Sequence, residues 1–406
     1  MTAAINAAKN GHRVVLIEKN EKIGKKLYIT GKGRCNLTNC SSFDNYMQNI
    51  VSNPKFLFSA LRGFDCYDTM NMIEEAGIPL KTERGNRVFP LSDKSSDIIK
   101  AFDRLLKSND VDVHLHEKVQ NIRLKNGLVD KITTDKAEYD DVDAIIIATG
   151  GISYPTTGST GDGYNFAKVT GHKVIEAVPG LAGIYLDKTA NGLDLAFDGK
   201  SLMGISLKNV RAEILSNGKV ILSEFGEMIF TDKGVSGPII LTLSSKINRL
   251  ELDKLLLKID LKPAISEEEL DARLLREFKA NANKDFKNAL SSLLPSGLIP
   301  FIISYCGIDG NKKINSVTKA ERKSLISALK ELKFSIKCLE PIEHAVITAG
   351  GVDVGDIEPN TMRSKIVKNM YFAGEVIDID ALTGGYNIQL AISTGYMAGN
   401  KIKNNA

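Results

Sequence analysis

The sequence lacks any apolar run long enough to span a bilayer, and its first residues lack the basic start and apolar core of a secretion signal. We therefore expect a cytoplasmic protein. It also lacks a strong charge imbalance, because 53 Lys and Arg residues stand against 49 Asp and Glu residues, a formal charge of +4. This excess is too small and too dispersed to indicate nucleic acid or a membrane surface as a partner. We expect a small-molecule substrate, and nothing in the sequence indicates the oligomeric state.

Cysteine is scarce, and the pattern of cysteines and histidines favours neither a disulfide-bonded scaffold nor a metal site. The five cysteines are scattered and odd in number: Cys35, Cys40, Cys66, Cys306 and Cys338. This pattern favours reduced thiols over a disulfide framework. The five histidines stand apart from the cysteines, and only His114 and His116 are close together. No metal-ligand spacing results, so we expect no metal.

What is present is enough for a large core, since 43% of the 406 residues are hydrophobic. This length is typical of two or three domains. Short apolar strands alternate with helical stretches over residues 1–183, which predicts α/β structure. Residues 184–262 predict an inserted antiparallel β domain, and residues 263–340 a helical subdomain with helix starts at Ser266 and Thr318. A glycine-rich α/β pattern returns at residues 341–406, so residues 184–340 are predicted to be an insertion that splits one α/β domain into two parts.

The chain opens on a small-residue helix that ends at Gly11, followed by a short apolar strand that Glu18 closes. In nucleotide-binding βαβ units, an acid at such a strand end takes the ribose hydroxyls. A carboxylate accepts hydrogen bonds from a free ribose diol and repels a 2′-phosphate, so the position suits FAD or NAD and not NADP. The alternative is that Glu18 is an ordinary polar residue at a strand end.

Three further stretches of the split domain carry candidate chemistry. The loop from Gly24 to Asn36 offers backbone N–H groups, three lysines and an arginine, as a pyrophosphate or flavin contact requires; a basic surface turn is the alternative. The strand at 145–148 ends in Thr149 and Gly150, a tight turn of the kind that approaches the adenosine end of a cofactor; a simple loop is the alternative there.

The third stretch runs from the strand at 370–374 to a helix that begins near Asn387, after Gly384 and Gly385. Unpaired N–H groups at such a helix start can face the flavin edge on which reduction places negative charge. Glu375, Asp378 and Asp380 are candidates for the ribityl hydroxyls, although a solvated loop would also explain any one of them. No catalytic acid or base is identified; Tyr154, Tyr386 and Lys32 are the plausible side chains.

Four motifs together resemble one protein family: Thr30–Asn39 (TGKGRCNLTN), Ala148–Pro155 (ATGGISYP), Gly226–Pro238 and Thr383–Asn387 (TGGYN). Over essentially the whole chain, the sequence resembles the BaiN-type FAD-dependent oxidoreductases, also labelled the aminoacetone oxidase family. The resemblance implies a Rossmann-like FAD-binding domain of the glutathione-reductase-like type, split by the β domain and the helical subdomain. It also implies hydride transfer between NAD(P)H, the flavin and an unidentified small organic substrate, with NAD(P)H as a transient reductant.

The same resemblance implies a set of FAD contacts. Glu18 would take the adenosine ribose, and Lys26 with the segment from Gly31 to Asn36 would line the pyrophosphate and flavin. The full predicted cofactor-binding set is Glu18, Lys19, Lys26, Gly31, Gly33, Arg34, Cys35, Asn36, Val119, Thr149, Gly150, Gly374, Glu375, Asp380, Gly384, Gly385, Tyr386 and Asn387.

The sequence departs from this family at its start, where members carry a strand and a Gly-x-Gly-x-x-Gly loop. Deleting that central strand would remove two ladders of hydrogen bonds. We therefore expect that Met1 is internal and that the natural product starts roughly 20 residues earlier; the chain as written is expected to bind FAD weakly or not at all.

Two other functions remain open. Cys35 and Cys40 have the CxxxxC spacing of a redox disulfide, which would make the chain a thiol-disulfide reductase that passes electrons from the flavin through this pair. Alternatively, the chain is a non-catalytic scaffold that has lost FAD. The intact loop at 383–389 argues against the scaffold.

Overall fold

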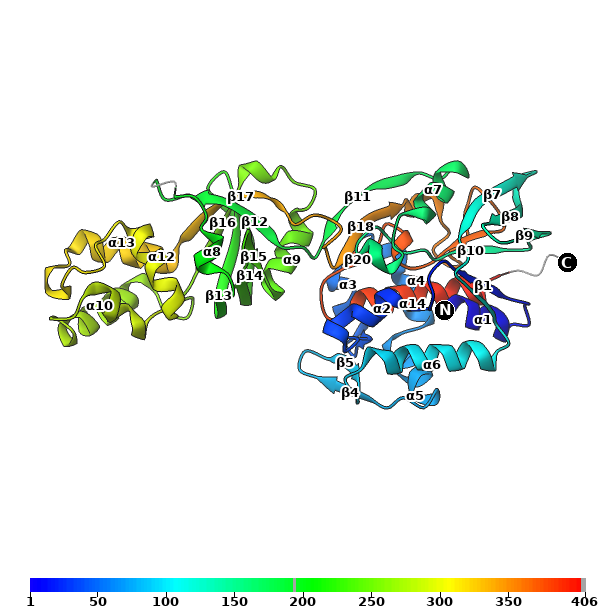
Figure 1. Ribbon diagram of the computed structural model, residues 1–406, viewed down its shortest axis with the longest axis horizontal. Coiled ribbons are helices and arrows are strands. Elements are labelled where there is room, and N and C mark those ends of the chain that lie inside the picture. The colour runs from blue at the N-terminus through cyan, green and yellow to red at the C-terminus, as the bar shows by residue number, and fades with distance from the viewer. Residues whose placement is uncertain (193–194, 403–406) are drawn as a thin grey trace. The chain divides into compact units, whose positions relative to one another are not determined.

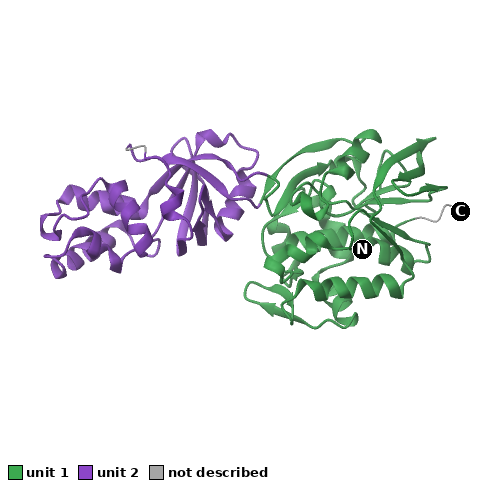
Figure 2. Cartoon of the chain, viewed as in Figure 1, with its two compact units in different colours: residues 1–180, 342–406 green, residues 181–341 purple. Residues whose placement is uncertain are grey.

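The chain forms two compact units. The structure, a computed structural model, describes residues 1–192 and 195–402 (Figure 1). Unit 1 comprises residues 1–180 and 342–406, and unit 2 comprises residues 181–341 (Figure 2). Unit 1 is therefore built from both ends of the chain, and unit 2 is a continuous insertion into it.

Unit 1 is a mixed α/β structure. Its helices are α1 (Thr2–Lys9), α2 (Lys25–Ile29), α3 (Phe43–Asn49), α4 (Phe58–Gly63), α5 (Cys66–Glu75), α6 (Ser95–Ser108), α7 (Asp162–Val169) and α14 (Tyr386–Asn400). Its strands are β1 (Val15–Glu18), β2 (Thr38–Asn39), β3 (Ile50–Ser52), β4 (Leu80–Glu83), β5 (Arg87–Pro90), β6 (Asp112–Leu115), β7 (Val119–Lys125), β8 (Leu128–Thr134), β9 (Glu138–Asp140), β10 (Ile145–Ile147), β11 (Val174–Gly180), β18 (Ile347–Val352), β19 (Met370–Phe372) and β20 (Asp380–Ala381).

Two parallel strand pairs give unit 1 its α/β character. β1 pairs with β6, so that Glu18 lies opposite Leu115, and β10 pairs with β19, so that Ile147 lies opposite Phe372. Parallel neighbours need a crossover connection, and here long stretches that contain helices supply it. In the described part of the chain, β1 and β10 each have this one strand partner. Antiparallel pairs and three-stranded sheets complete the unit, in the orders β2-β5-β4, β7-β8-β9, β11-β18 and β20-β3.

Helix α14 is held against the small-residue helix α1 at very short range. A Cβ atom added at Gly399 would lie 2.2 Å from the carbonyl oxygen of Ala3, and one at Gly395 would lie 3.3 Å from Cβ of Thr2. Glycine is therefore required where the two backbones approach. The flanking core includes Ile5, Phe372 and Leu390, which are almost completely buried. Each such side chain contributes about 1.5–3 kcal/mol to folding, so this packing fixes the direction of α14.

Unit 2 contains a closed antiparallel barrel in the order β12-β15-β14-β13-β16-β17. The strands are β12 (Ile184–Thr189), β13 (Ser206–Ser216), β14 (Lys219–Phe230), β15 (Gly234–Ser236), β16 (Leu255–Asp260) and β17 (Leu332–Leu339). The inward side chains Ile214, Leu257 and Phe334 are fully buried. The helices of this unit are α8 (Gly199–Leu202), α9 (Pro238–Ile247), α10 (Glu267–Ala280), α11 (Phe286–Ala289), α12 (Ile299–Cys306) and α13 (Lys319–Lys330).

Two helices of unit 2 begin where the sequence predicts. Ser266 caps α10 by accepting a hydrogen bond from Glu269 N, and the Glu269 side chain accepts one from Ser266 N. Thr318 and Glu321 cap α13 in the same reciprocal way. Each capping box satisfies backbone donors that the first helical turn leaves unpaired, so these starts are local properties of the sequence.

The barrel differs from the expected strand pattern in two places. The apolar runs at 219–222 and 228–231 are read from the sequence as two short strands, but the structure joins them in one strand, β14. Gly226, between the two runs, pairs with Val210 of β13, and the register of the pairing shifts between Leu207 and Val210. Residues 332–339, expected within the helical subdomain, form β17 and close the barrel between β12 and β16. Within residues 1–192 and 195–402, no helix is long and apolar enough to cross a membrane.

Candidate functional site

The loop from Gly24 to Asn39 has an unusual backbone. After α2, a short 3-10 turn (Thr30–Gly33) contains Gly31, Lys32 and Gly33 at φ of 57°, 57° and 83°, and Cys35 follows at 58°. A Cβ atom at Gly31 would lie 2.9 Å from Asn36 N, so that position needs glycine. A Cβ atom at Gly33 would meet nothing within 4 Å. The loop therefore presents open backbone at Gly33.

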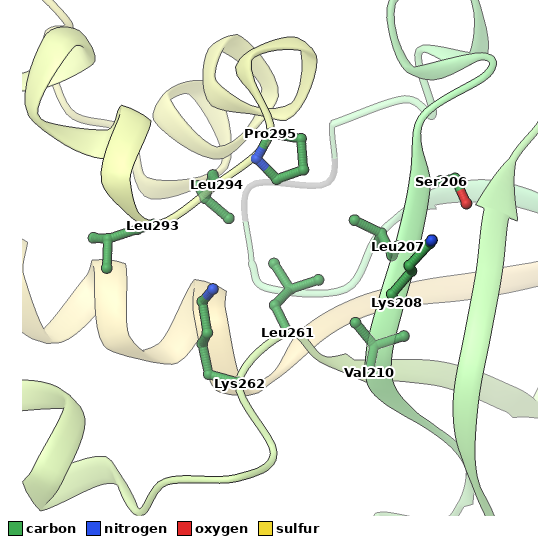
Figure 3. A pocket seen from close by; sticks show the side chains of 9 residues that line it. All are labelled: Ser206, Leu207, Lys208, Val210, Leu261, Lys262, Leu293, Leu294 and Pro295. Atoms are coloured by element: carbon green, nitrogen blue, oxygen red, sulfur yellow. The ribbon is translucent and has the colours of Figure 1, made fainter.

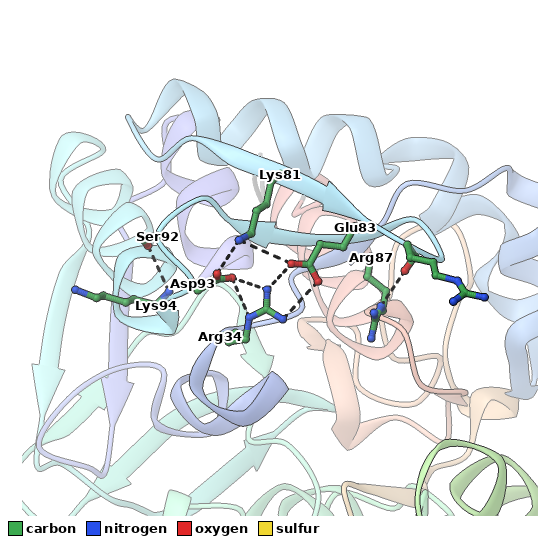
Figure 4. Close-up of polar contacts among 8 residues, drawn as sticks. Arg34, Lys81, Glu83, Arg87, Ser92, Asp93 and Lys94 are labelled. Carbon is green, nitrogen blue, oxygen red and sulfur yellow. Dashed lines mark hydrogen bonds and ion pairs between the residues drawn. The ribbon is translucent and has the colours of Figure 1, made fainter. Parts of the chain in front are cut away.

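The side chain of Arg34, a predicted cofactor contact, binds the β4–β5 hairpin and the turn that follows it (Figure 4). Its guanidinium donates to Glu83 at 2.5 Å and to Asp93 at 2.6 Å, and it lies over the Phe89 ring. Lys81 donates to Asp93 at 2.6 Å. The hydrogen bond from Arg34 lowers the pKa of Glu83. The hydrogen bond from Lys81, and to a smaller extent that from Arg34, lowers the pKa of Asp93. Arg34 thus anchors the loop from Gly24 to Asn39 to the β4–β5 hairpin.

The start of helix α14 lies beside this loop. Gly384 and Gly385 precede the helix at φ of 129° and 98°, and a Cβ atom at Gly385 would lie 2.4 Å from the Thr38 carbonyl oxygen. Asn39 Nδ2 donates to the Gly384 carbonyl at 2.9 Å and to that of Gly85 at 3.0 Å. A helix of this length carries a partial positive charge at its N-terminus, and the glycines leave it without covering side chains.

Two side-chain oxygens flank the same turn. Oδ1 of Asn36 and Oδ1 of Asn39 are buried, and neither has a hydrogen-bond partner among the described residues. Asn36 Oδ1 lies 3.0 Å from the position that a Cβ atom of Gly385 would take. Buried acceptors without donors are costly, so this turn suits a ligand that brings N–H or O–H groups. The predicted cofactor FAD carries both, in its ring and its ribityl chain, and the residues present therefore fit it.

Lys26 and Glu375, both predicted to contact the cofactor, contact each other. Lys26 Nζ donates to the two Glu375 carboxylate oxygens at 2.6 and 2.9 Å and to Ser153 Oγ at 2.7 Å. Thr348 N donates to Glu375 at 2.9 Å, and Thr348 Oγ1 accepts from Ser153 N at 3.1 Å. Sequence reasoning missed Thr348 and gave no role to Ser153, which lies in the Ala148–Pro155 motif. The two residues connect α2, β18 and the turn after β10.

The predicted ribose acid lies at the end of β1. Glu18 Oε1 accepts from the backbone and side-chain nitrogens of Asn20 at 2.8 and 2.7 Å. Its neighbour Lys19 donates to Thr160 at 2.5 Å and to Asp162 at 2.7 Å. Lys19 therefore ties the end of β1 to the start of α7, and Glu18 keeps one carboxylate oxygen, Oε2, for which no hydrogen bond is formed within residues 1–192 and 195–402.

Thr149 and Gly150 lie in the turn after β10, separated from the strand by Ala148. A Cβ atom at Gly150, whose φ is 73°, would lie 3.7 Å from Glu375 Oε2, so this turn adjoins the Lys26–Glu375 pair. Gly374 packs against α14: a Cβ atom added at Gly374 would lie 3.4 Å from Cβ of Ala391 in that helix. Val119 begins β7 and pairs with Thr134.

The remaining predicted residues hold the loop that leads into α14. Asp380 is buried in β20, opposite Ser52 of β3. Asn387 donates to the Ala381 carbonyl at 2.6 Å and accepts from Ala381 N at 2.9 Å, which closes the loop from 381 to 387.

The three candidate acid–base residues have different surroundings. Tyr386 is buried, and its hydroxyl accepts from Asn45 Nδ2 at 3.0 Å. Tyr154 is half-buried at φ of 51°, and Lys32 is exposed. None of the three is brought next to a second ionisable group by a hydrogen bond among the described residues, so the geometry selects none of them as catalytic.

The thiols bear on the thiol-disulfide alternative. Cys35 and Cys40 are free, and Cys35 is fully buried. Burial raises the pKa of Cys35 to about 12. The thiolate is the reactive form, so the environment of Cys35 disfavours attack on a disulfide. Among the residues that the structure describes, no group of three or more His, Cys, Asp or Glu side chains is placed to hold a metal ion.

Residues 1–401 match the family model described as the HI0933-like protein Rossmann domain. Curated relatives match over nearly their whole length. A 3-dehydro-bile acid delta(4,6)-reductase from Clostridium scindens is 28% identical, covering 98% of this chain and 95% of that protein. A ribosomal RNA dihydrouridine synthase from Escherichia coli is 28% identical, covering 96% and 92%, and one from Haemophilus influenzae is 29% identical, covering 97% and 93%.

Among solved structures, a 3-ketosteroid-delta4-(5alpha)-dehydrogenase from Rhodococcus jostii RHA1, in complex with 4-androstene-3,17-dione, shares the fold with a TM-score of 0.52. It is 14% identical, and the match covers 99% of this chain and 94% of that one. The predicted fold class, a Rossmann-like FAD-binding α/β fold, is confirmed. The chain belongs to the HI0933-like family, the family of BaiN-type FAD-dependent oxidoreductases, and it is an enzyme.

Proposed function

We propose that this enzyme is an FAD-dependent reductase that saturates a carbon–carbon double bond conjugated with a carbonyl group in a small organic substrate. NADH or NADPH, bound transiently, would reduce the flavin, and the reaction would take place in the cytoplasm. Bound FAD would supply the hydride chemistry through its isoalloxazine ring. The protein would supply binding, orientation and electrostatics.

The observation that carries the proposal is the bare N-terminus of α14 beside the two unpartnered asparagine oxygens. A positive helix end favours negative charge near its first N–H groups. The glycine pair leaves these groups uncovered, while Asn36 and Asn39 offer acceptors to N–H and O–H donors. Such a site binds a planar group that gains negative charge at one edge and carries donors at another, as a flavin does.

We assign the other contacts by position. Glu18 would accept hydrogen bonds from the adenosine ribose through its remaining carboxylate oxygen, Oε2. Glu375 would face the ribityl chain, with Lys26 and Thr348 N fixing its carboxylate. Open backbone at Gly33 would approach the pyrophosphate. Arg34 would act indirectly, by holding this loop against Glu83 and Asp93.

The names of the relatives support the choice of substrate bond. The Clostridium scindens protein is named as a delta(4,6)-reductase of a 3-dehydro-bile acid, and the other two as dihydrouridine synthases. Both names describe the saturation of a double bond that is conjugated with a carbonyl group. This chemistry is common to relatives with otherwise unlike substrates, so we propose it for this enzyme.

Uridine in ribosomal RNA is a second candidate substrate. The two dihydrouridine synthases match this chain as fully as the bile acid reductase does. Against it stands the formal charge of only +4 over 406 residues, since phosphate contacts dominate the binding of nucleic acids. We therefore favour a small enone as the substrate, and the test below includes ribosomal RNA as the second candidate substrate.

The test is a single-turnover experiment with the FAD-loaded protein under anaerobic conditions. NADH or NADPH is added until the flavin bleaches, followed by either a 3-oxo-4,6-diene steroid or unmodified ribosomal RNA. The proposal expects the flavin to reoxidise with the steroid, whose mass rises by two hydrogen atoms. Reoxidation by RNA alone, with formation of dihydrouridine, would move the function to the second candidate. Reoxidation by neither would contradict the proposed reaction.

A further inference from the structure

A small cavity in unit 2 lies outside the site described above. It has a volume of about 110 Å³, is partly open to solvent, and is bordered by three segments: β13, the residues just after β16, and residues 293–295 (Figure 3). Leu207, Leu261, Leu293 and Leu294 form apolar walls, and all four are buried. Two lysines, Lys208 and Lys262, also line it. Lys208 is exposed and Lys262 is half-buried, so Lys262 is the cation closest to the apolar walls. Apolar walls with a few polar groups are the usual composition of a site for a mainly apolar ligand.

Lys262 is a half-buried cation that lacks a counter-ion. Its ammonium group forms no ion pair within the residues that the structure describes. The two carboxylates near it are each paired with another cation: Asp260 with Lys330 at 2.7 Å, and Glu277 with Arg273 at 2.9 Å. Burial, followed by repulsion from Arg273, lowers the pKa of Lys262, and Glu277 offsets part of this effect. An anion placed in the cavity would supply an ion-pair partner for Lys262 and counter the repulsion from Arg273.

The donors around the cavity decide which anion fits. A phosphate has several charged oxygens and needs many donors, whereas leucine walls supply none. A carboxylate has one charge and two oxygens, which one or two ammonium groups satisfy. Its attached hydrocarbon chain would gain from contact with the leucines at about 25 cal/mol per Å² of buried apolar surface.

We propose that this cavity binds a small carboxylate, with the carboxylate group on Lys262, Lys208 at the rim, and a short hydrocarbon chain against Leu207, Leu261, Leu293 and Leu294. The proposal is independent of the reductase function, because no residue of the FAD site lines the cavity. The volume limits the enclosed part of the ligand to a few carbon atoms, since one water molecule occupies about 30 Å³ in the liquid.

The test measures binding of pentanoate to the full chain by isothermal titration calorimetry. Pentan-1-ol serves as the uncharged analogue, and uridine 5′-monophosphate as the phosphate arm. The variant Lys262→Met removes the charge while keeping a flexible chain. Lys279→Met is its matched control, because Lys279 is exposed on α10 of the same unit and does not line the cavity.

We expect pentanoate to bind more tightly than pentan-1-ol and uridine 5′-monophosphate. Loss of a charge-assisted hydrogen bond should weaken pentanoate binding by roughly 10- to 100-fold in Lys262→Met and leave Lys279→Met unchanged. The proposal would be overturned if pentanoate did not bind, if pentan-1-ol bound equally well, or if both variants lost the same affinity. Preferred binding of uridine 5′-monophosphate would overturn the choice of carboxylate. The comparison of ligands on the unaltered chain holds even if Lys262→Met fails to fold.

Discussion

Replacing Gly385 by alanine tests the turn before α14. The φ of 98° at this position is left-handed, which costs an L-residue about 1–2 kcal/mol. The added Cβ would also lie 2.4 Å from the Thr38 carbonyl oxygen. Thr38 cannot yield easily, because its hydroxyl donates to Gln389 at 2.6 Å and lies 2.9 Å from the Tyr46 hydroxyl. Relief of the overlap by backbone movement adds about 1–3 kcal/mol.

Gly127→Ala is the matched control. Gly127 has a φ of 77° in the β7–β8 turn, and a Cβ atom there would meet nothing within 4 Å. This variant should lose only the backbone contribution of about 1–2 kcal/mol, whereas Gly385→Ala should lose about 2–5 kcal/mol. Urea unfolding measures both losses, and flavin fluorescence measures FAD affinity, which should fall in Gly385→Ala alone. Equal losses of stability together with unchanged FAD affinity would refute the reasoning.

Three further predictions concern single side chains. Lys26→Met should lower the free energy of unfolding by about 1–3 kcal/mol, because it leaves the half-buried Glu375 carboxylate without its ion-pair partner. The control Lys25→Met, which removes an ion pair to the exposed Glu21, should lower it by at most about 1 kcal/mol. Equal losses of the two variants in urea unfolding would contradict this. Burial lowers the pKa of His172 below 6.5, so the unfolded state binds the proton first and stability should fall as the pH drops below 6.5; His172→Gln should flatten that slope, and an unchanged slope would count against it. Cys35 should react with maleimide only after unfolding, because burial raises its pKa to about 12; rapid labelling of the folded Cys40→Ser variant at Cys35 would show otherwise.

Elements specified by neighbouring residues could be predicted from the sequence. The starts of α10 and α13 follow from the pairs Ser266–Glu269 and Thr318–Glu321, each within one helical turn. The start of α14 follows from two glycines and was predicted within one residue of Tyr386. These signals need no knowledge of the rest of the fold.

Elements specified by distant partners could not be predicted. β17 follows a helical segment in the sequence, and its role appears only when β12 and β16 pair with it. Residues 219–222 and 228–231 are read from the sequence as two strands, yet pairing with β13, in which Gly226 lies opposite Val210, joins them in β14. The same applies to the site: Arg34 contacts Glu83 and Asp93, which lie 49 and 59 residues further along the chain. Sequence reasoning found the charged loop but not what its arginine binds.

The Lys26–Glu375 pair shows the same limit. Both residues were predicted for the site, but they are 349 positions apart, and no local pattern indicates that they bind each other. Asn39 belonged to a recognised motif without a role, which its hydrogen bonds to Gly384 and Gly85 now supply. The residues of the site were thus more predictable than the interactions among them.

The visible absorption spectrum of the protein purified at its natural length tests the central claim most directly. The account predicts flavin bands near roughly 375 and 450 nm, with FAD released on denaturation. A colourless protein that gains no such bands when FAD is added would contradict it.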